Sequence, residues 1–195
     1  HGSRTDYYHR ANSYLDRVID DREGLPITLS VLYMEIGRRL GLNIVGVGLP
    51  AHFVVRHEPP RGPTQLIDVF DRGTFLTRDD ADKLVQELTG ESLDEQFLAA
   101  YSKRQIPARV LQNLMGVAQA ADDREAMLGY SEAIVAIAPD DIQSRGMRAV
   151  MRFQTGRRAA AVDDLDWILK KQPEGIDLDE LRAMREHFAT APLPE

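Results

Sequence analysis

The sequence predicts an α+β protein in which a domain with a small antiparallel sheet is followed by a region built only of helices. Three short strand-like segments stand between helical segments in the first hundred residues. From about Gln105 onward, the spacing of apolar residues is helical throughout. A chain of 195 residues, 43% of them hydrophobic, can bury one substantial core or two small ones, so we expect a soluble globular protein.

Two helices are expected before the first strand. Asn12 or Ser13 can cap a short helix that continues through Ile19. The second helix is more strongly signalled, because Pro26 suits a first helical position and Gly41 suits a C-terminal cap. Its apolar residues recur at helical spacing and should bury one face: Leu29, Leu32, Tyr33, Ile36 and Leu40.

Three strands are expected next, at Asn43 to Leu49, Ala51 to His57 and Gln65 to Phe70. The loop between the last two is marked by turn-forming residues, which are Pro59, Pro60, Gly62 and Pro63. A hairpin of this length can bring His52 beside Asp68, sixteen residues later, so that an imidazole meets a carboxylate.

Capping signals predict two more helices after the strands. Thr77 with Asp80, and Ser92 with Glu95, have the three-residue spacing of a capping box. In such a box each side chain bonds to the backbone N–H of the other residue, so both positions mark the start of a helix.

The helical region has an internal period. Pro139 and Pro173 are 34 residues apart, which is the period of the tetratricopeptide repeat. A further helix is expected from about Asp177. The sequence therefore predicts a short tetratricopeptide-like array, whose small residues let paired helices approach closely. The segments before the two prolines share one pattern: Ala126, Tyr130 and Ala133 against Ala161, Leu165 and Ile168.

The charge of the chain argues against nucleic acid and membranes as partners. There are 31 acidic and 24 basic residues, giving a net charge of −7 without a basic stripe. Binding to nucleic acid or to an anionic membrane requires clustered Lys and Arg that displace counterions. No apolar run approaches the roughly 20 residues needed to cross a bilayer. We therefore expect a cytoplasmic protein, whose oligomeric state the sequence leaves open.

The chain contains no cysteine, which excludes disulfides, thiolate metal sites and cysteine nucleophiles. Its five histidines form no metal-ligand pattern, and its single glycines form no phosphate-binding or dinucleotide-binding fingerprint. We expect neither a metal nor a cofactor.

The N-terminal His1, Gly2 and Ser3 look like the remnant of an affinity tag. Near Gln105 the predicted structure changes from mixed strands and helices to helices alone, which places a domain boundary after residue 103. The sequence thus predicts a tag remnant at residues 1–3, a first domain at 4–103 and a helical domain at 104–195.

Four short motifs, taken in sequence order, make the chain resemble the bacterial SirB-type proteins. These proteins combine a transglutaminase-like N-terminal domain with tetratricopeptide-like helices. The resemblance covers nearly everything from Asn12 to about Pro173. It implies that the first domain has a transglutaminase-like, papain-like fold. The motifs that carry it are Asn12-Ser13-Tyr14-Leu15, Gly24-Leu25-Pro26, Leu49-Pro50-Ala51-His52-Phe53 and Asp68-Val69-Phe70.

The resemblance also implies where a catalytic site would lie. In active members of the wider transglutaminase-like group, a cysteine begins the helix that ends in a Leu-Gly pair. Counting back fifteen residues from Gly41 leads to Pro26, while the group's histidine and acid correspond to His52 and Asp68. The base and its orienting acid therefore match and the nucleophile does not, a departure that the SirB-type pattern shares.

Other roles for these residues stay open. His52 and Asp68 can satisfy each other as buried polar groups without doing chemistry. Thr28 and Ser30 are the hydroxyls nearest the helix start, and each can equally bond to a neighbouring carbonyl.

Three arginines offer a candidate binding row in the repeats. Arg145, Arg148 and Arg152 are spaced about one turn apart on one side of a helix and would favour acidic segments, or form an ordinary solvated face.

The sequence supports two hypotheses of different class. The first is a non-catalytic protein-interaction or regulatory module, a pseudoenzyme domain joined to a repeat, with a protein or peptide partner. The alternative is a hydrolase or acyl-transferase that works without cysteine, using His52 and Asp68 with water or Ser30 as the attacking group.

Overall fold

The computed structural model describes residues 1–7 and 9–192, and the chain divides into two compact units. The first unit is residues 1–110 and the second is residues 111–195. Residues 193–195, which end the second predicted domain, lie outside the described residues.

The division between the compact units falls after residue 110, within helix α4 (Gln105–Ala120), and the domain bounds 4–103 and 104–195 stay a prediction. Ile106 and Val110 in its first turns pack against a buried cluster that contains Leu25, Ile27 and Phe53 of the first unit. The start of the helical region therefore belongs to the core of the preceding unit.

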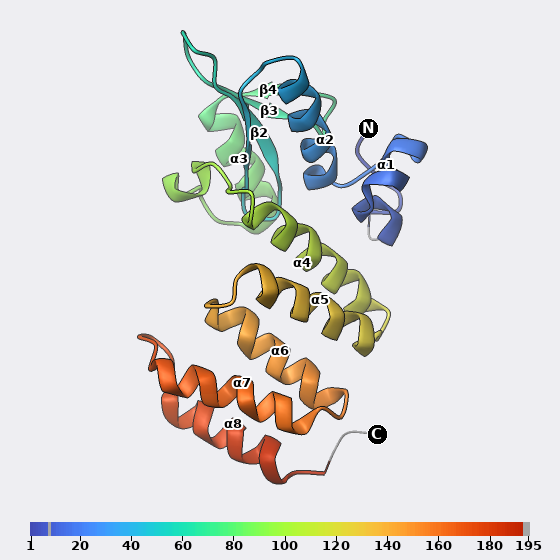
Figure 1. Cartoon of the computed structure of the whole chain (residues 1–195). Helices are drawn as coiled ribbons and strands as arrows, with labels where there is room; N and C mark the ends of the chain where they lie inside the picture. Colours follow the sequence, from blue (N-terminus) through green and yellow to red (C-terminus); the bar gives the residue numbers. More distant parts are fainter. Residues whose placement is uncertain (8, 193–195) are drawn as a thin grey trace. The chain divides into compact units, whose positions relative to one another are not determined.

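The first unit is built on a four-stranded antiparallel sheet whose strands follow one another in sequence order (Figure 1). The strands are β1 (Ile44–Val47), β2 (Val54–His57), β3 (Gln65–Asp68) and β4 (Thr74–Leu76). All three predicted strands are present but shorter than expected. The sequence analysis missed β4, which has only three residues and begins directly after Gly73, a left-handed turn residue with φ of 79°.

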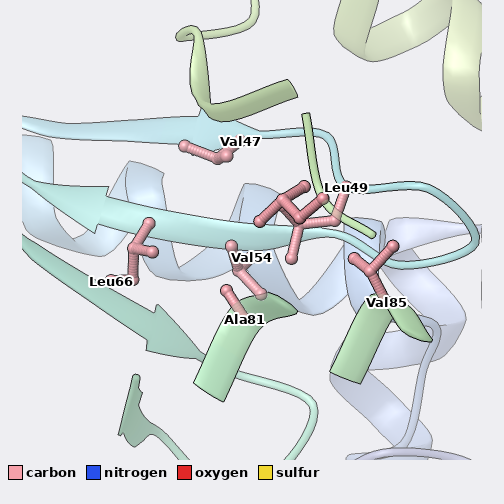
Figure 2. Packing of buried hydrophobic residues seen from close by; sticks show 7 residues of the cluster. Val47, Leu49, Val54, Leu66, Ala81 and Val85 are labelled. Carbon is pink, nitrogen blue, oxygen red and sulfur yellow. The ribbon is translucent and has the colours of Figure 1, made fainter. Parts of the chain in front are cut away.

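Two helices cover opposite faces of this sheet. Helix α2 (Pro26–Arg39) packs on β1 and β2, and Ile44 comes so close that a Cβ on Gly37 would lie 2.4 Å from its Cδ1. Helix α3 (Arg78–Thr89) lies on the other face (Figure 2), where Val47, Val54 and Leu66 point toward Ala81 and Val85. Burial of these aliphatic side chains is the main term that holds the sheet to α3.

The buried face of α2 differs from the prediction. Ile36 and Leu40 are 59% and 71% exposed, whereas Ile27 and Gly37 are buried. The reason is the close approach of Ile44, which is possible only over a residue without a side chain. The predicted ends of the helix are confirmed: Pro26 is its first residue, and Gly41 follows it with φ of 77°.

One of the predicted capping boxes is correct. Thr77 accepts a hydrogen bond from the backbone N–H of Asp80, and the Asp80 carboxylate accepts one from the N–H of Thr77. The box at Ser92 and Glu95 is wrong, because Asp94 caps a short 3-10 helix at Glu95–Leu98.

The predicted cap of the first helix is also wrong. Helix α1 (Leu15–Asp21) begins after Tyr14, and Asn12 and Ser13 belong to a preceding 3-10 helix (Arg10–Ser13). The Asn12 amide donates instead to the carbonyl of Asp6, because the chain before it folds back within its reach.

Up to residue 192, where the description ends, the second unit contains the rest of α4 and four further helices, each packed on the next (Figure 1). Helix α8 begins at the predicted place, with Asp177 accepting hydrogen bonds from the N–H groups of Asp179 and Glu180. This order confirms the predicted all-helical repeat region. The helices are α5 (Arg124–Ile137), α6 (Ile142–Gln154), α7 (Arg158–Lys171) and α8 (Leu178–Thr190).

The N-terminal residues are part of the first unit. Gly2 pairs with Gly24 in a parallel bridge, the N–H of Ser3 donates to the carbonyl of Gly24 at 3.0 Å, and both Gly2 and Ser3 are buried. Their origin as a tag remnant stays a prediction. In the part of the chain that is described, no helix combines the length and the apolar character required to span a membrane.

Candidate functional site

The structure brings His52 and Asp68 into direct contact. Nε2 of His52 lies 2.9 Å from Oδ2 of Asp68, and both side chains are buried. His52 does not lie in a strand as expected: it follows the turn at Ala51, which has φ of 57°, and its N–H donates to the carbonyl of Leu49. The turn tightens the connection between β1 and β2 and so directs His52 to the end of β3, where Asp68 lies.

Asp68 is held as a carboxylate. Burial alone would raise its pKa, but the hydrogen bond and the charge of His52, helped by the N–H groups of Asp71 and Phe70, lower the pKa below its usual value. A carboxylate only accepts hydrogen bonds, so Nε2 of His52 carries the proton. In the neutral ring Nδ1 is then the free acceptor, and it has no hydrogen-bond partner among residues 1–7 and 9–192.

The lowered pKa of Asp68 gives a pH prediction. Replacing Asp68 with Asn should lower stability at neutral pH by about 1–3 kcal/mol, because buried donors lose their charged acceptor. A depressed folded-state pKa contributes stability above the unfolded value of about 3.9, and the contribution is lost as pH falls through the folded value. The Tm difference between wild type and Asp68→Asn should therefore shrink as the pH falls below about 5.

Thermal unfolding followed by circular dichroism between pH 2.5 and 7 measures this difference. Asp20, an exposed residue of α1, provides the matched control, since Asp20→Asn should leave the profile unchanged. A Tm difference that widens as the pH falls below 5 would contradict the ionised state of Asp68.

The pair lies at the wall of a cavity of about 940 Å³. This volume is in the upper part of the range for small-ligand sites. Phe70 stands edge-on to the His52 ring with centroids 5.9 Å apart, and Tyr7 stands edge-on to Phe70. The remaining walls come from Arg4, from Pro26 at the start of α2, and from one side of α3, including Lys83 and Leu84.

The sequence offered three positions for a nucleophile: Pro26, where the family's cysteine would lie, and the hydroxyls of Thr28 and Ser30. Of these, Pro26 alone lines the cavity. The hydroxyl of Thr28 is committed to structure: it accepts the N–H of Leu25 at 3.0 Å and donates to the carbonyl of Asn12 at 2.8 Å. Ser30 is fully buried, and its hydroxyl has no partner among the described residues. Neither hydroxyl is part of the cavity wall.

The predicted arginine row occupies a different place, within the second unit. Arg145, Arg148 and Arg152 all donate to the carboxylate of Asp164, a buried residue of α7. Their role in binding a peptide stays a prediction, and the contact with Asp164 is an internal role that the sequence analysis did not foresee. A signal was present, since Asp164 interrupts the apolar face formed by Ala161, Leu165 and Ile168.

Other site residues were missed as well. Tyr7, Arg4 and Lys83 line the cavity but come from segments that carry no motif. Phe70 had a signal, because it closes the Asp68-Val69-Phe70 motif. No group of three or more His, Cys, Asp or Glu side chains within residues 1–7 and 9–192 is placed to hold a metal ion.

Comparison with known proteins gives two family matches. Residues 1–112 match the model of the transglutaminase-like superfamily, and residues 114–186 match that of the tetratricopeptide repeat. No solved structure is significantly similar to the chain.

Several curated proteins are similar over most of the chain. A UPF0162 protein of Xylella fastidiosa (strain Temecula1) is 32% identical over 189 residues, which is 93% of this chain and 66% of that protein. UPF0162 protein YchA of Escherichia coli (strain K12) is 25% identical over 90% of this chain and 66% of its own length. F-box only protein 21 of Mus musculus is 28% identical over 80% of this chain, but over only 26% of its own length. The chain thus spans slightly less than two thirds of the bacterial relatives.

Proposed function

Because this chain belongs to the transglutaminase-like superfamily, we propose that it is a protein-interaction or regulatory module whose first unit works without thiol catalysis. The family and repeat matches, together with the UPF0162 relatives, confirm the expected SirB-type resemblance. One observation carries the proposal: Pro26 lines the cavity with His52 and Asp68, at the position where the resemblance places a nucleophile. Proline has no atom that can attack a carbonyl.

The proposal follows from what thiol catalysis requires. It needs a sulfur whose pKa is lowered by a helix N-terminus and an imidazole, and an acid that orients the imidazole. This chain supplies the helix N-terminus at Pro26, the imidazole and the acid, but has no cysteine. General acid–base help alone is typically worth about 10² to 10⁴ in rate, far below the acceleration of a complete enzyme. We therefore assign the cavity beside His52 to the binding of a ligand and not to catalysis.

The repeats support a protein partner. Tetratricopeptide arrays present extended surfaces to peptides and proteins. We place this activity in the bacterial cytoplasm, in keeping with the bacterial relatives and the absence of cysteine. Neither nucleic acid nor a membrane is proposed as a partner, since the charge of the chain is −7.

A second candidate function is a hydrolase or acyl-transferase that uses His52 and Asp68 without a cysteine. The intact pair favours it, because Nδ1 of His52 is free to accept a proton from a water molecule in the cavity. Ser30 does not line the cavity, so water is the attacking group that this candidate requires.

Replacing His52 with Ala separates the two candidates. We expect the wild type and His52→Ala to show the same background hydrolysis of a p-nitrophenyl ester, and neither to link an amine to a glutamine donor. We also expect His52→Ala to lower the Tm, because it leaves the buried Asp68 carboxylate without its main partner. Absorbance of released nitrophenol and mass spectrometry of the donor peptide provide the measurements.

His57→Ala is the matched control, since His57 lies in β2 outside the cavity wall. Turnover above background that survives in His57→Ala and disappears in His52→Ala would overturn the proposal in favour of the hydrolase.

A further inference from the structure

The apolar stripe of α2 is left uncovered by the rest of the chain. Its spacing predicts a buried face, yet Ile36 is 59% exposed and Leu40 is 71% exposed. Leu42, just after the end of the helix, is 45% exposed. Leu29 and Tyr33, nearer the start of the helix, are half-buried. No segment within residues 1–7 and 9–192 therefore covers the C-terminal half of the stripe.

The stripe has the spacing of a helix that pairs with another helix. Intervals of four, three and four residues separate its members, which are Leu29, Tyr33, Ile36 and Leu40. Alternating intervals of three and four residues place apolar side chains along one seam, as in a coiled coil. The seam is roughly 17 Å long. A different side of α2, which includes Gly37, already packs on the sheet, so the seam is free to receive a second helix.

The C-terminal end of the seam carries surplus positive charge. Arg38 and Arg39 both donate to the single carboxylate of Glu35, in contacts of 2.8 Å. Their side chains are 71% and 73% exposed, so donors of both guanidiniums still face the solvent. One carboxylate cannot neutralise two guanidiniums, and a net charge of +1 remains at this end of α2.

The other end of α2 carries surplus negative charge. Residues 20–23, which lead toward the helix, hold three acidic side chains and one basic side chain. Asp21 is exposed and Glu23 is half-buried, and neither forms an ion pair within the described part of the chain. The surface along α2 is thus acidic at one end, apolar along its length and basic at the other end. Such a surface is complementary to itself when it is turned end to end.

From this self-complementarity we propose that the α2 face binds the α2 face of a second copy of the chain, with the two helices antiparallel. The seams pack on each other, so Ile36 and Leu40 are removed from water. The basic end of each helix then faces the acidic end of the other. One surface that serves both partners is the property of a two-fold symmetric dimer. This inference goes beyond the function proposed above, because it concerns the first unit and not the repeats.

The size of the surface predicts a weak dimer. The seam is roughly 17 Å long and one helix of about 10 Å wide. Stable complexes bury about 800 Å² on each partner, which is far more than a contact of this length provides. We therefore expect a dimer that forms at high protein concentration and dissociates on dilution, with a Kd on the order of 10⁻⁴ M.

Sedimentation velocity of the full chain tests the inference. Between about 5 and 500 µM, the sedimentation coefficient should rise toward that of a dimer, because association follows mass action. Ile36→Ser should keep the fold and weaken dimerisation by about tenfold or more, since a two-fold interface loses the apolar contact twice. Phe75→Ser is the matched control: Phe75 is 63% exposed on β4, outside the α2 face, and its replacement should leave the Kd unchanged.

A charge swap tests the antiparallel arrangement. Arg39→Glu places an acid opposite the acidic end of the partner and should weaken dimerisation by about five-fold or more at low ionic strength. Adding Glu23→Arg to Arg39→Glu reverses both ends together and should restore most of the lost affinity. Circular dichroism verifies the fold of each variant.

Three results would overturn the inference: a monomer at every concentration, a dimer that Ile36→Ser leaves intact, or a charge swap that restores no affinity. A monomer would mean that the seam is covered by something other than a second copy. None of these outcomes depends on His52 or on the repeats, so failure here is distinct from failure of the proposed function.

Discussion

Replacing Asp164 with Asn is expected to destabilise the second unit by about 3 to 5 kcal/mol, the cost of leaving buried charges without their counterion. The side chain of Asp164 is 2% exposed and is the only carboxylate that contacts Arg145, Arg148 and Arg152 together within the described residues. Asparagine keeps the size of the side chain but removes its charge, so three guanidiniums remain close together. Among the described residues, Glu132 is then the one carboxylate that still contacts them, at 3.3 Å from Arg152. A change of this size is comparable to much of the stability of a small domain.

The single tryptophan of the chain makes this prediction measurable for the second unit alone. Trp167 lies on α7 beside the cluster, so its fluorescence during urea unfolding follows this unit. The midpoint should fall by at least roughly 1 M urea. Asp163 is the preceding residue on the same helix and is exposed, so Asp163→Asn should leave the midpoint nearly unchanged. Equal midpoints for the two variants would show that the cluster does not depend on its carboxylate.

Sequence patterns predicted most of the fold because local signals and tertiary packing agree in it. Pro26 and Gly41 mark the ends of α2, and Thr77 with Asp80 marks the start of α3. The errors lie where tertiary contacts override a local signal. Ile36 belongs to an apolar helical stripe but is exposed, because Ile44 packs over Gly37. No local rule could predict which side of α2 the sheet approaches.

The candidate site was predictable where it depends on sequence order and spacing. The contact of His52 with Asp68 followed from a hairpin of suitable length, although His52 lies in a turn and not in a strand. The cavity itself was not predictable, since Arg4, Tyr7 and Lys83 meet there only after folding. Likewise, the spacing of the arginines on α6 was visible, but their common partner on α7 required the packing of two helices.

Introducing a cysteine at Pro26 is expected to create a reactive thiol. The residue is the first of α2 and lines the same cavity as His52, so a sulfur there would have a helix N-terminus and an imidazole nearby. Both lower the pKa of a thiol from about 8.5, and values between about 3.5 and 7.5 are found in such places. Alkylation of Pro26→Cys by iodoacetamide at pH 6.5 should then be about tenfold faster than that of an unperturbed thiol. The chain has no other cysteine, so mass spectrometry would report this one thiol.

Two variants separate the sources of that reactivity. Leu178 is the first residue of α8, so Leu178→Cys places a thiol at a helix N-terminus without an imidazole. Asp177 and Asp179 lie beside it and raise the pKa of a thiol, so its rate of alkylation is a lower limit. Adding His52→Ala to Pro26→Cys removes the imidazole from the same thiol and should slow alkylation toward the rate of Leu178→Cys. If the rate of Pro26→Cys does not depend on His52, the imidazole does not reach position 26, and the correspondence of Pro26 with a nucleophile position fails. If the rate falls as expected, the first unit retains the arrangement that activates a thiol, and the missing sulfur alone separates it from thiol chemistry.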